Sequence, residues 1–459
     1  MLILGLACFG THDSGVCITR DGEILYAAEE ALFSRVKHDP SFPERALAFG
    51  LERLGLTLAE FDHVAFFTDL KATTDLHLAL WNLVRYFPRS LQTLKFLRYH
   101  SRNTSLPDRL AERYGYRGPV HYVRHHYCHA ASTFFVSPFE RAAILTLDGT
   151  GEWTTTTMGV GEGNTFRNLR EVKFPHSLGR VYETFTQYLG FRPRSAEGKV
   201  MGLASYGEPV YRNEFAEILR LKDDGTFELD MSFFNFHTGG HLNYTLKLVR
   251  LFGPPREPES RLTARHENVA ASLQRRIEEA AVHMARRLAR DTGLRDLCLA
   301  GGVALNCKMN ARILEDGSFD RVYVVPAAGD PGTALGAAKY VEHMTLGRPR
   351  SAELVRPYLG PEYSEAEIER ALADSGEAYE RVEDPADRAA ALLEEGRIVA
   401  WFQGPVEFGP RALGGRSILA DPRDPKMKDV LNTKVKRRET FRPFAPAVLE
   451  ERMSEYAEA

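Results

Sequence analysis

The sequence predicts an α/β protein with a duplicated N-terminal domain and a smaller α/β C-terminal domain. Short strand-like apolar segments alternate with amphipathic helical patterns over most of the 459 residues. The order strand, polar loop, strand occurs at residues 2–19 and again at 142–160. A stretch rich in proline and glycine at 347–361 separates two predicted domains, which we place at residues 1–350 and 362–459.

The first half is predicted from three strand-like segments near the N-terminus. Residues 2–8 form a buried apolar run, and residues 16–19 and 23–30 follow as two more strands. The Asp21-Gly22 turn joins the last two strands as a hairpin. A small polar loop at residues 10–15 separates the first two.

The second half begins with the same order of elements. Residues 142–147 form a strand that runs into the loop Asp148-Gly149-Thr150-Gly151, and a further strand follows at 154–160. The two halves share little residue identity. The duplication is therefore inferred from the order of the elements and not from a sequence period.

The rest of the N-terminal domain is predicted to alternate helices with strands. Apolar residues at helical spacing predict a long helix at 267–290 whose apolar stripe faces the core. A strand at 296–300 leads through Gly301-Gly302 into a second helix. A strand at 321–325 leads through the turn at 329–332 into another.

The composition excludes several classes of protein. The 59 Lys+Arg and 62 Asp+Glu nearly cancel, so no global field attracts nucleic acid or a membrane. No apolar stretch approaches the roughly 20 residues of a membrane helix, and the N-terminus fits a signal peptide poorly. Five scattered cysteines without CxxC spacing favour reduced thiols. We therefore expect a cytoplasmic protein that holds anionic substrates with local basic groups.

Histidines and aspartates form a candidate metal site. His125 and His129 lie at i and i+4 near a plausible helix start, so both imidazoles share one face. Asp148 and Asp330 each end a predicted strand at a glycine-flanked turn, where a carboxylate can face a ligand. The histidine spacing alone is more often a structural pair. Together with two carboxylates it suits iron(II), manganese or zinc, which the spacing does not separate.

Three glycine turns that follow strands predict a nucleotide cleft between the two halves. They are Gly149-Thr150-Gly151, Gly301-Gly302 and the turn that ends at Gly332. Backbone N–H groups at such turns approach phosphates closely, and two of the turns lead into helix N-termini. Each turn alone is a weak signal. The sequence has no Walker A motif and no strict G-x-G-x-x-G, which disfavours P-loop and Rossmann folds.

The C-terminal part, which is predicted to open with two helices and a strand at 398–402, carries a dense set of cations. Arg411 and Arg416 lie in a glycine-rich turn that fixes them, and arginine forks suit phosphate recognition. The basic run 434–438 and Arg442 follow. Taken alone, this run fits a solvated basic face or a nucleic-acid patch equally well.

With these residues in place, the sequence resembles a known family, the O-carbamoyltransferases of nodulation-factor and antibiotic biosynthesis. The matching segments follow one another in order over nearly the whole chain. They are His12-Asp13-Ser14, residues 34–39, HHYCHAAS, LDGTGEW, EGKVMGLASYG, LAGGVALNCKMN, GDPGTALGAA, EFGPRALGGRS and NTKVKRRETFRPFAP.

The resemblance implies both the fold and the chemistry. The N-terminal domain is expected to resemble the tRNA threonylcarbamoyl transferase of the actin/Hsp70/hexokinase superfamily, and the C-terminal domain to resemble threonylcarbamoyl-adenylate synthase. Carbamoyl phosphate and ATP are expected to give carbamoyl adenylate and pyrophosphate in the second domain. The first domain is then expected to transfer the carbamoyl group to a small-molecule hydroxyl. Family members usually continue well past the segment ending at Pro446, so we expect a truncated or abbreviated second domain.

The resemblance also implies roles for individual residues. His125, His129, Asp148 and Asp330 are expected to hold iron or another first-row divalent metal, and ATP is expected to bind with Mg²⁺. Lys37 is expected to be a catalytic residue. The nucleotide-binding candidates are Gly149, Thr150, Gly151, Glu197, Lys199, Gly301, Gly302, Asn306 and Gly332. The carbamoyl phosphate candidates are Arg411, Arg416, Lys436 and Arg442.

The base for the transfer step is chosen from the first polar loop. His12 with Asp13 is our candidate for accepting the proton of the acceptor hydroxyl, although His12 fits a loop histidine bonded to backbone equally well. Two alternatives stay open: a sugar kinase-like phosphotransferase and a nucleotide-gated binding module on the same fold. The kinase alternative leaves the histidine cluster and the Arg411 turn unexplained. The sequence predicts neither the acceptor nor the oligomeric state.

Overall fold

The structure, a computed structural model, describes residues 1–9, 13–69, 105–238, 241–350 and 353–456. These residues form two compact units. The first comprises Met1–Pro361 together with Pro405–Arg411, and the second comprises Glu362–Gly404 together with Ala412–Ala459. We expected Arg411 in the second domain. It groups with the first unit because Glu407 forms a β-bridge with Tyr358, which holds this segment against the first unit.

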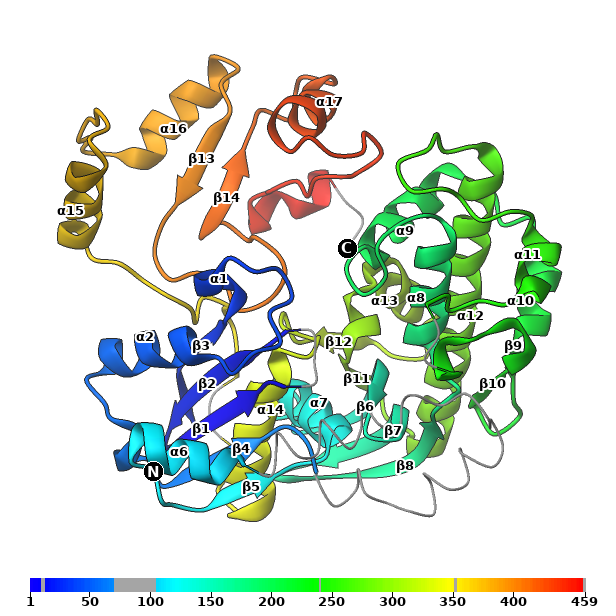
Figure 1. The fold of residues 1–459 in the computed structure, drawn as a ribbon, viewed down its shortest axis with the longest axis horizontal. Coiled ribbons are helices and arrows are strands. Elements are labelled where there is room, and N and C mark those ends of the chain that lie inside the picture. Colours follow the sequence, from blue (N-terminus) through cyan, green and yellow to red (C-terminus); the bar gives the residue numbers. More distant parts are fainter. Residues whose placement is uncertain (10–12, 70–104, 239–240, 351–352, 457–459) are drawn as a thin grey trace. The chain divides into compact units, whose positions relative to one another are not determined.

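The first sheet of the first unit contains the N-terminal strands (Figure 1). Its strands are β1 (Leu2–Ala7), β2 (Gly15–Arg20), β3 (Glu23–Glu29), β4 (His63–Phe66) and β5 (Val120–Tyr122). They lie in the order β3-β2-β1-β4-β5. The three consecutive strands pair antiparallel, and β1, β4 and β5 pair parallel.

The second sheet repeats this topology. Its strands are β6 (Arg141–Gly151), β7 (Thr154–Glu162), β8 (Thr165–Lys173), β11 (Asp296–Ala300) and β12 (Arg321–Val324). Their order is β12-β11-β6-β7-β8, with β6, β7 and β8 antiparallel and β6, β11 and β12 parallel. Because both sheets share one strand order and one set of directions, the predicted α/β fold with a duplicated, actin-like N-terminal domain is confirmed.

Two helices are exchanged between the halves. Helix α7 (His125–Phe134) follows the last strand of the first sheet but packs on β6 and β11 of the second. Helix α14 (Gly332–Tyr340) follows the last strand of the second sheet but packs on β1 and β2 of the first. The two helices also pack against each other. The contact is close, since a Cβ at Gly336 would lie 1.8 Å from the carbonyl oxygen of Cys128.

The remaining helices cover the sheets or form a helical region after β8. They are α1 (Ala31–Ser34), α2 (Glu44–Leu54), α6 (Leu106–Tyr114), α8 (Leu178–Tyr188), α9 (Glu197–Leu203), α10 (Arg212–Ile218), α11 (Leu246–Phe252), α12 (Ala264–Thr292) and α13 (Cys307–Glu315). A two-stranded sheet of β9 (Leu219–Leu221) and β10 (Phe227–Leu229) lies among them in the chain. Helix α12 contains the helix predicted at 267–290 and starts three residues earlier, after a capping box at Thr263.

The second unit is small. It contains α15 (Glu365–Ser375), α16 (Pro385–Glu394), β13 (Val399–Phe402), β14 (Arg416–Leu419) and α17 (Met427–Val430). β13 and β14 pair antiparallel. The two helices and the strand that the sequence predicts at the start of this domain are present. Across the described part of the chain, no helix has the length and apolar character that crossing a membrane requires.

Candidate metal centre

The first turn of α7 brings two histidines together. The helix begins at His125, so His125 and His129 lie one turn apart on the same face. Their Nε2 atoms are 3.0 Å apart. Both side chains are buried, with 4 % exposure for His125 and none for His129.

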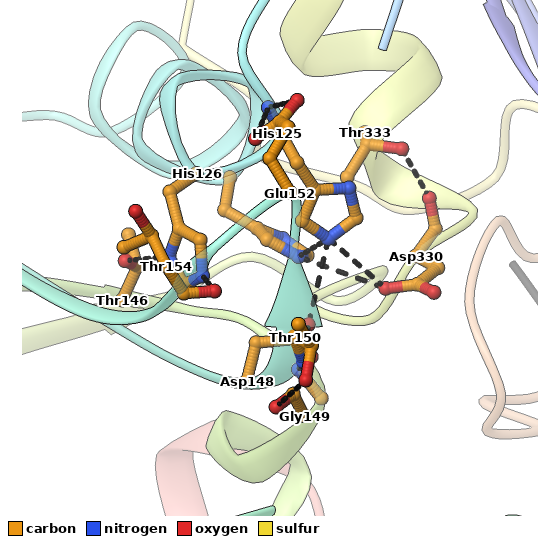
Figure 2. Close-up of polar contacts among 12 residues, drawn as sticks. His125, His126, Thr146, Asp148, Gly149, Thr150, Glu152, Thr154, Asp330 and Thr333 are labelled. Atoms are coloured by element: carbon orange, nitrogen blue, oxygen red, sulfur yellow. Dashed lines mark hydrogen bonds and ion pairs between the residues drawn. The ribbon is translucent and has the colours of Figure 1, made fainter. Parts of the chain in front are cut away.

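Two carboxylates face these imidazoles (Figure 2). Asp148 Oδ2 and Asp330 Oδ1 each lie 3.5 Å from His125 Nε2, and Asp330 Oδ1 lies 3.7 Å from His129 Nε2. Asp148 comes from β6 and Asp330 from the turn before α14. One ligand atom from each of the four residues lies within 4.8 Å of the others. The exchange of α7 between the halves therefore carries the histidines to the strand end that holds Asp148.

The spacing of these atoms fits a single ion. Two ligand atoms each about 2.1 Å from one ion lie roughly 3.0 Å apart at a right angle and roughly 3.4 Å apart at the tetrahedral angle. Four of the six pairs in the cluster are 3.0 to 3.7 Å apart, which covers both cases, and all four ligand atoms lie within 4.8 Å of one another. Imidazole nitrogen with carboxylate oxygen is a donor set for iron(II), manganese or zinc. The residues present therefore fit a first-row divalent metal.

The charges of the cluster shift its pKa values strongly. Burial lowers the pKa of His125, but hydrogen bonds and charge from Asp148 and Asp330 outweigh burial and raise that pKa to about 10. Burial raises the pKa of Asp148, and the facing histidines more than offset it, so the pKa lies well below its usual range. The pKa of Asp330 is likewise lowered by the histidines despite burial and the Asp148 charge. The pocket thus stabilises positive charge, as a proton or as a metal ion.

His126, which lies between His125 and His129 in the sequence, has a structural role. Its Nδ1 lies 2.7 Å from Thr146 Oγ1, and its Nε2 lies 3.0 Å from the carbonyl oxygen of Thr154 (Figure 2). Burial, reinforced by the neighbouring histidines, lowers the pKa of His126 to about 3. A neutral ring then donates from Nε2 to Thr154 and accepts at Nδ1 from Thr146. His126 ties α7 to β6 and β7.

The Gly301-Gly302 turn adjoins the carboxylate of Asp148. The backbone N–H of Gly302 donates to Asp148 Oδ1 at 3.0 Å, and that of Thr150 donates to Oδ2 at 3.3 Å. Two of the predicted nucleotide glycines have a packing reason to be glycine. A Cβ at Gly301 would lie 2.2 Å from the carbonyl oxygen of Leu147, and one at Gly332 would lie 1.8 Å from that of Ala327. Their identity is therefore set by backbone contacts within the protein, whatever else they bind.

Other predicted nucleotide residues lie on the helices after β8. Glu197 begins α9 and accepts the backbone N–H of Arg194 at 2.7 Å, and the Lys199 ammonium lies 5.7 Å from the ring centre of Phe191. Asn306 is buried. Its side chain caps α13 by accepting from the N–H of Met309 and exchanges two hydrogen bonds with Gln274. Asn306 therefore has an internal structural role.

The catalytic candidates are only partly described. His12 lies outside the described residues. Asp13 accepts from His38 Nδ1, with its two oxygens at 2.9 and 3.1 Å, and Lys37 Nζ donates to Ser195 Oγ at 2.9 Å. His38 was not predicted as a catalytic residue. Its position one residue after Lys37 was the available signal, but a pairing over 25 positions is not encoded in local spacing.

The four carbamoyl phosphate candidates divide between the two units. Arg411 belongs to the first unit and is exposed. Arg416 begins β14, and Lys436 follows α17, both with exposed side chains. The Arg442 guanidinium lies 3.9 Å from the Glu439 carboxylate. Arg411, Arg416 and Lys436 are thus exposed, whereas the Arg442 side chain is only 23 % exposed and pairs with Glu439.

Comparisons with known proteins give matches over almost the whole chain. Residues 2–339 match the family described as carbamoyltransferase N-terminus, and residues 390–459 match carbamoyltransferase C-terminus. An uncharacterized protein of Synechocystis is 42 % identical over 99 % of this chain and 77 % of its own length. Nodulation protein NolNO of Sinorhizobium fredii is 36 % identical over 97 % of this chain, which spans 64 % of that protein.

Among solved structures, component A of the (R)-2-hydroxyglutaryl-CoA dehydratase from Acidaminococcus fermentans superposes with a TM-score of 0.40. It is 15 % identical, and the match covers 74 % of this chain and 97 % of that one.

Proposed function

The chain belongs to the carbamoyltransferase family, and from this premise we propose that it is an ATP-dependent O-carbamoyltransferase with a small-molecule acceptor. The proposed reaction has two steps. Carbamoyl phosphate, ATP and water give carbamoyl adenylate, pyrophosphate and phosphate. A hydroxyl of the acceptor, a sugar, an antibiotic or another secondary metabolite, then takes the carbamoyl group, and AMP leaves.

The single observation that carries the proposal is the convergence of His125, His129, Asp148 and Asp330. We infer that these four residues hold iron or another first-row divalent metal. Such a metal supplies Lewis acidity for a carbonyl or phosphoryl oxygen. The Gly302 N–H on Asp148 joins this cluster to the turn that we propose for nucleotide phosphates. The chain's own contribution is to hold the carboxylate and imidazole donors converged and away from water.

The activation step needs groups that hold two anionic substrates. Guanidinium and ammonium groups bind phosphate oxygens directly, and arginine does so with two parallel N–H groups. We propose that Arg411, Arg416, Lys436 and Arg442 bind carbamoyl phosphate. ATP, with Mg²⁺, is proposed to bind through the glycine turns at 149–151 and 301–302.

The transfer step needs a base for the acceptor hydroxyl. We propose the first loop for this role, with His12 as the base and Asp13 beside it. Asp13 also binds the His38 imidazole, so its carboxylate fixes the orientation of that ring. Lys37 directly precedes His38 in the chain. We propose that its positive charge favours the negative charge that develops on the carbamoyl adenylate during transfer.

The test is an activity screen of the purified chain with ¹⁴C-labelled carbamoyl phosphate, ATP and a panel of aminoglycosides, nucleosides and polyketide alcohols. The proposal expects labelled carbamate ester and one AMP for each ester formed, with no product when ATP is omitted. Phosphorylated acceptor formed without carbamoyl phosphate would replace the proposal with the sugar-kinase alternative. Absence of any modified acceptor, together with ATP binding, would favour the binding-module alternative.

A further inference from the structure

The turn after Asp148 carries a glutamate in an unfavourable backbone conformation. Glu152 lies between β6 and β7, and its φ is 47°. A residue with a Cβ rarely occupies this left-handed region, whereas glycine adopts it freely. A non-glycine residue that keeps such a conformation is held there by its surroundings. The contacts of the Glu152 side chain account for this.

The Glu152 carboxylate caps the helix that carries the two histidines. Its Oε1 and Oε2 lie 3.0 and 3.2 Å from the backbone nitrogen of His125, the first residue of α7. Oε1 also accepts the N–H of Asp69, which follows β4, at 3.0 Å. The residue at the N-cap position itself, Arg124, makes no capping hydrogen bond with its side chain. The carboxylate of a glutamate 27 positions away in the chain therefore accepts the unpaired backbone N–H at the start of α7.

The same turn also contacts the imidazole of His125. A Cβ at Gly151 would lie 2.1 Å from His125 Cδ2, so the ring packs directly on the Gly151 backbone. Asp148 lies only four residues before Glu152 in the chain. One short segment thus supplies a carboxylate to the cluster, a surface for the ring of His125 and an acceptor for its backbone N–H.

We propose that Glu152 is a positioning residue for the metal cluster: its carboxylate fixes the start of α7 so that His125 faces Asp148 in the correct register. By also holding the N–H of Asp69, it ties the end of the first sheet to the turn of the second. This inference rests on the metal site proposed above. It does not depend on which acceptor is carbamoylated.

Three substitutions separate positioning from turn geometry. Glu152→Gly removes the carboxylate and relieves the left-handed backbone, and Glu152→Ala removes the carboxylate but keeps the strain. Glu152→Gln keeps an oxygen that can accept both N–H groups. Each full-length variant, stripped of metal, is titrated with Co²⁺, and binding is followed by the visible absorption of the bound ion, which reports coordination geometry.

A positioning role predicts that Glu152→Gly and Glu152→Ala weaken Co²⁺ binding by about 10- to 100-fold and alter the absorption spectrum. Glu152→Gln should restore affinity to within about threefold of the unsubstituted chain, since its amide oxygen can replace Oε1. Glu30→Ala is the matched control. Glu30 likewise accepts two backbone N–H groups, from Arg45 and Ala46, at the start of α2, a helix without cluster residues. That variant should keep the Co²⁺ affinity and spectrum.

A second measurement separates this inference from the metal proposal. Hydrogen exchange of the metal-free chain should accelerate at the first turn of α7 in Glu152→Gly and not in Glu30→Ala. If the unsubstituted chain fails to bind Co²⁺ while this local acceleration occurs, the metal proposal fails. The inference that Glu152 fixes the start of α7 then still stands. Unchanged Co²⁺ binding and unchanged exchange in both Glu152→Gly and Glu152→Ala would overturn the inference, because Glu152 would then only shape the turn.

Discussion

The Nε2 atoms of His125 and His129 face each other at 3.0 Å inside a pocket closed by two carboxylates. Without a metal, one of these nitrogens must carry the proton that lies between them. A metal ion bound here would be held by both of these nitrogens together with the two carboxylates. The relationship therefore makes metal binding and proton binding compete for one pocket.

The first prediction concerns metal content. We expect the purified chain to carry close to one first-row metal ion, and we expect His129→Ala to weaken metal binding by on the order of 100-fold, since one imidazole donor is lost from the set. Elemental analysis of both proteins after gel filtration measures this. His283→Ala is the control, because His283 bonds to a backbone oxygen of Lys222 away from the cluster. Full carbamoyl transfer by protein free of metal would contradict the proposal.

The second prediction is the pH dependence of metal binding. The pKa of His125 is raised to about 10 in the metal-free chain, so at pH 7 the imidazole is protonated. A metal ion must displace that proton, and affinity should therefore rise about tenfold per pH unit between pH 6 and 8. Calorimetric titration in two buffers of different ionisation enthalpy should give release of one proton per ion. Binding that is independent of pH in this range would mean that His125 is already neutral.

The same pKa has a consequence for stability. Because the folded-state pKa of His125 lies above its ordinary value of 6.5, protonation stabilises the metal-free fold. This contribution is fully present below about pH 6.5 and is lost as the pH rises toward 10. The metal-free chain should thus lose stability over this interval relative to His125→Gln, measured by urea unfolding at each pH.

Much of the fold could be predicted because its signals are local. The alternation of apolar segments and the Asp21-Gly22 turn place strands β1 to β3 within one or two residues. The i, i+4 spacing of His125 and His129 requires only that a helix begin there, and α7 does. β4 and β8 were not predicted. β4 is only four residues long, too short for a periodic signal.

The parts that were missed depend on contacts between distant segments. The exchange of α7 and α14 between the sheets follows from packing that no local pattern records. Glu152 acts on a residue 27 positions earlier, and the pairing of His38 with Asp13 spans 25. The reason for glycine at two predicted turn positions was also ambiguous. At Gly301 and Gly332 the sequence could not separate close approach of a ligand from close approach of the protein's own backbone.

The fourth prediction concerns Gly302. Gly302 lies in the turn that we propose for the nucleotide phosphates, so a side chain at this position should obstruct ATP. A Cβ at this position would also lie 3.1 Å from Asp148 Oδ1, closer than most such contacts. Gly302→Ala should therefore weaken Co²⁺ binding by about tenfold as well as ATP binding, because Asp148 must shift. Calorimetry with each ligand measures this. Gly198→Ala, where the Cβ meets open space, is the control and should leave Co²⁺ binding unchanged.

The last prediction separates the two proposed half-reactions. If Arg411 binds carbamoyl phosphate, Arg411→Ala should lower carbamoyl phosphate-dependent exchange of pyrophosphate into ATP by roughly 100-fold, because the two parallel N–H groups that its guanidinium offers to phosphate are lost. Transfer from chemically supplied carbamoyl adenylate should persist, since that step is assigned to the metal cluster. Arg423→Ala is the matched control: Arg423 is an exposed arginine paired with Asp421, and its loss should change neither step.

His125→Ala should give the reverse pattern. Adenylate should still form, but the acceptor should stay unmodified, because the cluster loses the imidazole that faces both Asp148 and Asp330. Radiometric exchange and mass spectrometry of the acceptor follow the two steps in the same preparations. If Arg411→Ala and His125→Ala each eliminate both steps in folded protein, one shared site performs all the chemistry. If the unsubstituted chain transfers from supplied adenylate but makes none, the activation assignment fails and only the transfer assignment stands.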